Sequence, residues 1–119
     1  MPRPQHREGT MLFAVASKDG REINQHFGHA ERFLIYEVRG TDVSLVDDKK
    51  VERYCTYDEA HPLRRHVLRA IAESLQGCAA VVCSQIGPAP REEMSRLGLE
   101  VYCASGEIRP TLVELAKLF

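Results

Sequence analysis

The sequence predicts an α/β domain in which a five-stranded mixed sheet is flanked by three helices. Two uninterrupted apolar runs, Met11–Ser17 and Ala79–Ser84, have the composition of strands that are covered on both faces. Segments rich in strand-forming residues follow the first run, and after the second run short strands alternate with helical patterns. The length of 119 residues is close to the commonest domain size, so we expect one domain.

The first half of the chain is expected to be a flexible tail, residues 1–10, followed by an antiparallel meander that opens the single domain of residues 11–119. A loop of turn-forming residues separates the first two strands, and a shorter turn separates the second from the third. The third strand becomes charged toward its end, as the edge of a sheet does. The predicted strands are Met11–Ser17, Glu31–Arg39 and Val43–Val51.

The second half alternates helices with buried strands. In Leu63–Gln76 apolar side chains recur every four residues, and Gly77 is a natural helix end. The arginines of this segment lie off the apolar stripe, where we expect a solvated face; they are Arg64, Arg65 and Arg69. The later elements are predicted at Ala79–Ser84 (strand), Pro90–Leu97 (helix), Leu99–Cys103 (strand) and Ile108–Phe119 (helix).

The first, fourth and fifth strands are expected to be parallel, because right-handed crossovers through helices connect them. The predicted sheet order is 3-2-1-4-5 with strand 2 antiparallel, which is a ribonuclease-H-like motif. In this topology several segments reach the end where the parallel strands finish: the loop at 18–30, Cys55, His61, residues 84–87 and residues 103–105. Open α/β sheets bind ligands at that end, and the amino terminus of the second helix favours an anion there.

Composition and charge argue against several classes of function. A formal net charge of −1 gives no support to nucleic-acid binding, and no apolar run approaches the ~20 residues of a membrane span. The first ten residues lack the apolar core of a secretory signal. Four cysteines without such a signal favour free thiols in a reducing compartment, so we expect a cytoplasmic protein.

The segment Asn24–Ala30 holds two histidines, His26 and His29, on either side of a Phe-Gly pair. Imidazole is a common metal ligand, and glycine at position 28 lets the backbone approach a ligand closely. We interpret the segment as a ligand-binding loop at the edge of a rigid sheet. A polar turn whose histidines only cap backbone groups is an equally weighted interpretation of the same residues.

The four cysteines differ in what they predict. Cys55 lies in a polar loop, and this setting supports ligation of a soft metal and a spare thiol equally. The spacing of Cys78 and Cys83 is weak evidence for a metal site, and we expect both Cys83 and Cys103 to be packed as small apolar groups. Because no C-x₂-C pair is present, neither a closed zinc site nor a four-cysteine cluster is expected.

The sequence holds no pattern of a catalytic site. Nucleases with a ribonuclease-H-like motif need clustered carboxylates to hold paired metals, whereas the strands at 11–17 and 79–84 contain none and Asp19 stands alone in a loop. A nucleophile elbow and a phosphate-binding G-x-x-x-x-G-K loop are also absent. We therefore expect no nuclease activity.

Several segments together resemble the dinitrogenase iron–molybdenum cofactor biosynthesis family, the group of NifX-like and NifB-C-terminal-like carrier domains. The similarity covers roughly residues 11–119 and is most specific in the His-Phe-Gly-His loop with its flanking strands. The matching segments are Val15–Ser17, Asn24–Ala30, Phe33–Val38, Val51–Cys55, Val81–Pro90 and Leu97–Val101.

This resemblance implies a carrier and not an enzyme, which transiently binds an iron–sulfur cluster, or an iron–molybdenum cofactor precursor, during nitrogenase cofactor assembly. The expected cofactor contacts are His26, Phe27, Gly28, His29, Cys55 and Gly87, of which the two histidines and the cysteine would bind metal. NifB places a radical-SAM domain ahead of such a module. Without that domain, this chain is not expected to make the precursor itself.

An alternative from another class is an interaction or regulatory module that docks on a cofactor-assembly enzyme and binds no cluster. The expected partners are assembly proteins that donate and accept the cluster, with no nucleic acid and no membrane. We expect a monomer or a weak homodimer.

Overall fold

The computed structural model describes residues 9–55 and 63–119, so the expected position of His61 lies outside the described residues. Within these ranges the main sheet has five strands in the order β4-β3-β1-β5-β6. β3 runs antiparallel to both β1 and β4, whereas β5 runs parallel to both β1 and β6. The sheet strands are β1 (Thr10–Val15), β3 (Arg32–Arg39), β4 (Asp42–Lys50), β5 (Ala80–Cys83) and β6 (Val101–Cys103).

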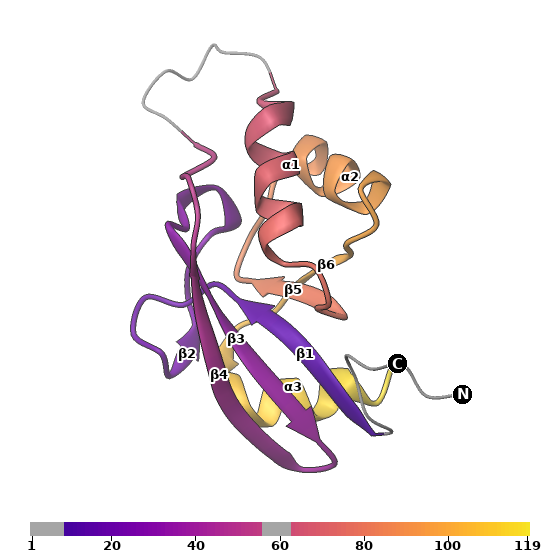
Figure 1. Ribbon diagram of the computed structural model, residues 1–119. Coiled ribbons are helices and arrows are strands. Elements are labelled where there is room, and N and C mark those ends of the chain that lie inside the picture. Colours follow the sequence, from indigo (N-terminus) through magenta and orange to yellow (C-terminus); the bar gives the residue numbers. More distant parts are fainter. Residues whose placement is uncertain (1–8, 56–62) are drawn as a thin grey trace, which may run out of the picture.

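Helices cover both faces of this sheet, with α1 and α2 together on one side and α3 on the other (Figure 1). The predicted α/β class, with a five-stranded mixed sheet and three helices in the described residues, is confirmed, and the observed order corresponds strand for strand to the predicted one. The ribonuclease-H-like assignment stays a prediction. The helices are α1 (Arg65–Ser74), α2 (Pro88–Arg96) and α3 (Ile108–Ala116).

The central strand β1 explains why both faces need helices. Its side chains alternate, so Phe13 and Val15 pack in the core under α3, while Ala14 packs in the core under α1 and α2. All three residues are fully buried. This is the environment that the uninterrupted apolar run predicted, because a strand covered on both faces has no solvated side.

A second, two-stranded sheet was not predicted. β2 (Glu22–Ile23) pairs antiparallel with β7 (Gly106–Glu107), and the N–H of Ile108 donates a hydrogen bond to the carbonyl of Arg21 at 2.9 Å. The prediction of a plain loop at 18–30 is therefore wrong, and the short segment before the last helix also contains a strand. The consequence is that the loop after β1 is tied to the start of α3.

Element boundaries differ from the prediction by a few residues. β1 begins at Thr10, which had been assigned to the tail, and the tail up to residue 8 lies outside the described residues. α1 is shorter at both ends than the predicted Leu63–Gln76. α2 begins at Pro88, where the missing N–H of proline costs nothing in the first turn. None of the helices in the described ranges is both long enough and apolar enough to cross a membrane.

Candidate functional site

The two loop histidines stack on each other because a 3₁₀ turn lies between them. Residues Phe27–His29 form this turn, and His26 precedes it as the capping residue. With three residues per 3₁₀ turn, side chains at positions i and i+3 eclipse. The ring centroids of His26 and His29 are accordingly 5.2 Å apart with 16° between the planes. Both histidines are exposed, so the pair presents its ring nitrogens to solvent.

Backbone pairing holds this turn at the carboxyl end of β5. His26 forms an isolated parallel bridge with Gln85, and the N–H of Phe27 donates to the Gln85 carbonyl at 2.9 Å. The N–H of Ser84 donates in turn to the carbonyl of Gln25 at 3.0 Å. The histidine turn therefore continues the sheet and occupies the end at which open α/β sheets bind ligands.

Cys55 joins the histidines at the same turn. Its N–H donates to the carbonyl of Gly28 at 2.8 Å, and the half-buried thiol lies directly against Gly28. A β-carbon at position 28 would overlap the Cys55 sulfur. Gly28 is thus required by the close approach of a thiol, and Cys55 lies against the turn that carries His26 and His29.

A Gly28→Ala substitution is expected to lower the free energy of unfolding by about 1–3 kcal/mol, because the new methyl group displaces the Cys55 segment. Gly87→Ala is the matched control, since a β-carbon there would meet Pro90 at an ordinary 3.6 Å. We expect the control to cost under about 1 kcal/mol. Urea denaturation of both variants measures the difference, and equal losses would show that the thiol does not need the space at Gly28.

Arg64 holds the segment that contains Cys55, and the prediction missed this role. Its guanidinium donates to the carbonyl of Tyr54 at 2.7 Å and to that of Arg53 at 3.2 Å. The same group forms an ion pair with Glu52 at 2.7 Å. The predicted solvated face is wrong for Arg64, whose side chain is only 18% exposed, although Arg65 and the next arginine on this helix are exposed.

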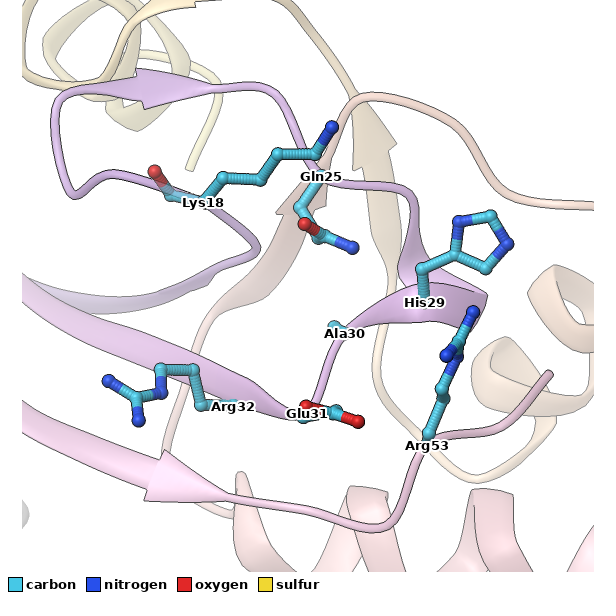
Figure 2. Close-up of a pocket in the computed structure, with 8 residues that line it drawn as sticks. Lys18, Gln25, His29, Ala30, Glu31, Arg32 and Arg53 are labelled. Atoms are coloured by element: carbon cyan, nitrogen blue, oxygen red, sulfur yellow. The ribbon is translucent and has the colours of Figure 1, made fainter. Parts of the chain in front are cut away.

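A polar cavity of about 430 Å³ opens beside the histidine turn. Figure 2 shows Arg53 rising toward the turn that holds His29, with Gln25 and Lys18 on the opposite side. Arg32 extends away along β3, where it pairs with Asp48 at 3.2 Å. The lining of the cavity contains more cationic than anionic side chains. The lining residues are Ser17, Lys18, Gln25, His29, Ala30, Glu31, Arg32 and Arg53.

The loop before β2 is fixed by its own polar groups, and this places Lys18 at the cavity. One carboxylate oxygen of Asp19 accepts from the N–H groups of Arg21 at 2.9 Å and Glu22 at 3.1 Å. These two N–H groups hold the pKa of the Asp19 carboxyl below its usual value. The N–H of Lys18 donates to the Asn24 side-chain oxygen at 2.8 Å, so the loop is ordered up to the histidine segment.

Two other predicted contacts lie in different environments. Phe27 is 1% exposed, and its ring packs on Phe33 at 5.7 Å between centroids. The ring is therefore part of the core and not of the exposed surface. Gly87 is exposed and caps the amino terminus of α2, two residues beyond the Gln85 that pairs with the histidine turn.

The remaining cysteines are divided between the two ends of β5. Cys83 is fully buried, as expected. Cys103 is exposed, so the prediction that it packs is wrong. Cys78 precedes β5 at its other end, and burial raises the pKa of its thiol to about 11.

Sequence reasoning missed the cationic lining of the cavity, since isolated Lys and Arg residues in loops have no distinguishing spacing.

The donor atoms at the turn suit a guest larger than one ion. No group of three or more His, Cys, Asp or Glu side chains within residues 9–55 and 63–119 is arranged to hold a single metal ion. Two imidazoles and one thiol are nevertheless soft or borderline donors that can bind different atoms of one cluster. The adjoining cations favour a guest with negative charge.

Comparison with known proteins finds both sequence and structural similarity. The sequence model of the family described as dinitrogenase iron-molybdenum cofactor matches residues 9–118. Over 90 residues, the chain is 42% identical to FeMo cofactor biosynthesis protein NifB of Frankia alni and 37% identical to that of Azotobacter vinelandii. The backbone is similar to the crystal structure of PH0822, with a TM-score of 0.63 and 22% identity over 90% of this chain and 89% of that one. This last likeness concerns the fold alone.

The chain corresponds to only a part of the NifB relatives. Each of the two alignments covers 76% of this chain but 18% of the relative. The activity of a whole NifB protein therefore does not follow from the similarity of this part.

Proposed function

The chain belongs to the dinitrogenase iron-molybdenum cofactor family, and on this premise we propose that it binds an anionic iron–sulfur or iron–molybdenum cofactor, or a precursor, and passes it on. The observation that supports this most is the convergence of two exposed imidazoles and a thiol on one turn. The rings of His26 and His29 stack at 5.2 Å, and the backbone of Cys55 is bonded to the same turn.

The cationic cavity supports an anionic cargo. Lys18 and Arg53 line it together with His29, and Glu31 is the single carboxylate among the lining residues. Arg32 also lines the cavity but is paired with Asp48. Guanidinium groups can donate several hydrogen bonds to sulfide or oxygen atoms of a cluster. The imidazole and the cations thus offer a ligand bond and charge neutralisation to one guest.

The exposure of the donors supports transfer in preference to permanent storage. A structural metal site is closed by a full set of ligands, whereas His26 and His29 stand at the surface and Cys55 is half-buried. A partner protein can therefore reach the same cluster while these ligands hold it. We propose a carrier without catalytic activity, which acts in the cytoplasm as a monomer or weak homodimer between a cluster donor and a cluster acceptor.

Cluster uptake by the metal-free chain tests the proposal. Anaerobic reconstitution with iron and sulfide, followed by removal of unbound cluster, is expected to leave a visible charge-transfer absorption that is stoichiometric with the chain. Iron and sulfide analysis of the same sample gives the cluster content. If the chain retains no iron and the metal-free chain captures a cofactor-assembly enzyme, the chain is instead an interaction module that binds no cluster.

A further inference from the structure

Two thiols outside the histidine turn lie next to each other at the carboxyl edge of the sheet. Cys83 and Cys103 are register partners in the parallel pair β5–β6 and are the last residues of their strands. Register partners project to the same face of a sheet. For this pair it is the face of α1 and α2, since Cys83 packs there with Val101, two residues before Cys103. Both cysteines are free thiols.

Because burial favours the protonated thiol, Cys83 is expected to lose its proton only to a bound cation. Burial raises the pKa of its thiol to about 12, and the Cys103 thiol contributes through its charge and through a hydrogen bond. The N–H groups of Gln85 and Phe27 act in the opposite direction by hydrogen bonding to the Cys83 sulfur. Donors of this kind stabilise metal-bound sulfur. Cys83 is fully buried and Cys103 is exposed, so an ion from solvent would meet the Cys103 thiol before the Cys83 thiol.

The strand spacing has room for a bridging ion. Neighbouring strands are about 4.8 Å apart, and a disulfide spans about 4.4–6.8 Å between α-carbons, so the site is tested on the reduced chain without air. A linear two-coordinate ion holds its sulfurs about 4.6 Å apart, if a metal–thiolate bond is taken as about 2.3 Å. Because the described residues provide no third His, Cys, Asp or Glu ligand, tetrahedral zinc is not suited. Soft thiolates select Cu(I) among the remaining ions.

We propose that Cys83 and Cys103 form a two-coordinate thiolate site for Cu(I) at the carboxyl edge of β5 and β6, which shares no ligand with the neighbouring histidine turn. On binding, two S–H bonds break, two S–Cu bonds form and two protons pass to solvent. Copper stays monovalent, so no electron donor or acceptor is needed.

An anaerobic titration of the metal-free chain with Cu(I), against a chromophoric Cu(I) chelator, tests this site. Cys103→Ser is expected to weaken one tightly bound equivalent about 10- to 100-fold. Because Cys103 is exposed, the variant keeps its fold, which circular dichroism verifies. Cys78→Ser is the matched control at the opposite end of β5 and is expected to leave that equivalent unchanged.

Two further measurements separate this site from the histidine turn. The His26→Ala/His29→Ala variant is expected to keep the equivalent that Cys103→Ser loses, and copper X-ray absorption is expected to show two sulfur neighbours. Wild-type affinity in Cys103→Ser, or nitrogen ligation of the tight equivalent, would overturn the proposal. Neither result would bear on cluster uptake at the turn, because the two sites share no ligand.

Discussion

The His26→Ala/His29→Ala variant is expected to bind an iron–sulfur cluster about 100-fold more weakly than the wild-type chain. Loss of a group that only orients a ligand already costs about 10- to 100-fold in metal affinity, and this variant removes two direct donors. Both side chains are exposed and leave the core intact, so the loss reflects binding alone. Competition with a cluster-accepting chelator, followed by visible absorption, measures the affinity.

His66→Ala is the matched control for this experiment. His66 is an exposed histidine in the first turn of α1 and lies on a different element from the histidine turn. It is expected to keep wild-type affinity. If the double variant also retains the cluster with wild-type affinity, the histidine turn is not the binding site, even though the chain itself binds cluster.

The parts of the fold that could be predicted are those whose signal is local. The run Ala79–Ser84 predicted a strand buried on both faces, and β5 is buried along its whole length. Alternating strands and helices predicted the layers, because right-handed crossovers leave few arrangements. The pairing of β2 with β7 joins residues more than eighty positions apart. Strands of two residues have no pattern to detect.

The two histidines could be singled out because they flank a Phe-Gly pair in a polar loop between strands, whereas their stacking and their partners depend on the folded structure. Cys55 lies against Gly28 because of the register of β3 with β4 and because Arg64 donates a hydrogen bond to the Tyr54 carbonyl. The amphipathic pattern of the helix assigns Arg64 to the solvated side. The pattern cannot show that the segment containing Tyr54 covers this residue. Cys103 is exposed at the carboxyl end of the edge strand β6. Apolar composition alone could not reveal this.

Phe27→Ala is expected to lower the free energy of unfolding by about 3–5 kcal/mol, the usual cost of removing a buried phenylalanine ring. The ring is 1% exposed and packs on Phe33. Because a domain of this kind has about 5–15 kcal/mol of stability in total, the loss is a large share. Urea denaturation followed by circular dichroism measures it. Phe119→Ala is the control: this residue is 48% exposed, and its loss should cost clearly less.

Phe27→Leu separates packing from direct contact with the cluster. Leucine keeps much of the apolar volume, so the expected loss of stability is under about 1.5 kcal/mol. Cluster affinity is expected to stay at the wild-type value, because a buried ring supports the turn from beneath and does not touch the guest. A stable Phe27→Leu variant with a tenfold or greater loss of cluster affinity would show that the ring itself contacts the cofactor, as the resemblance to carrier domains implied, and that the turn opens to admit it.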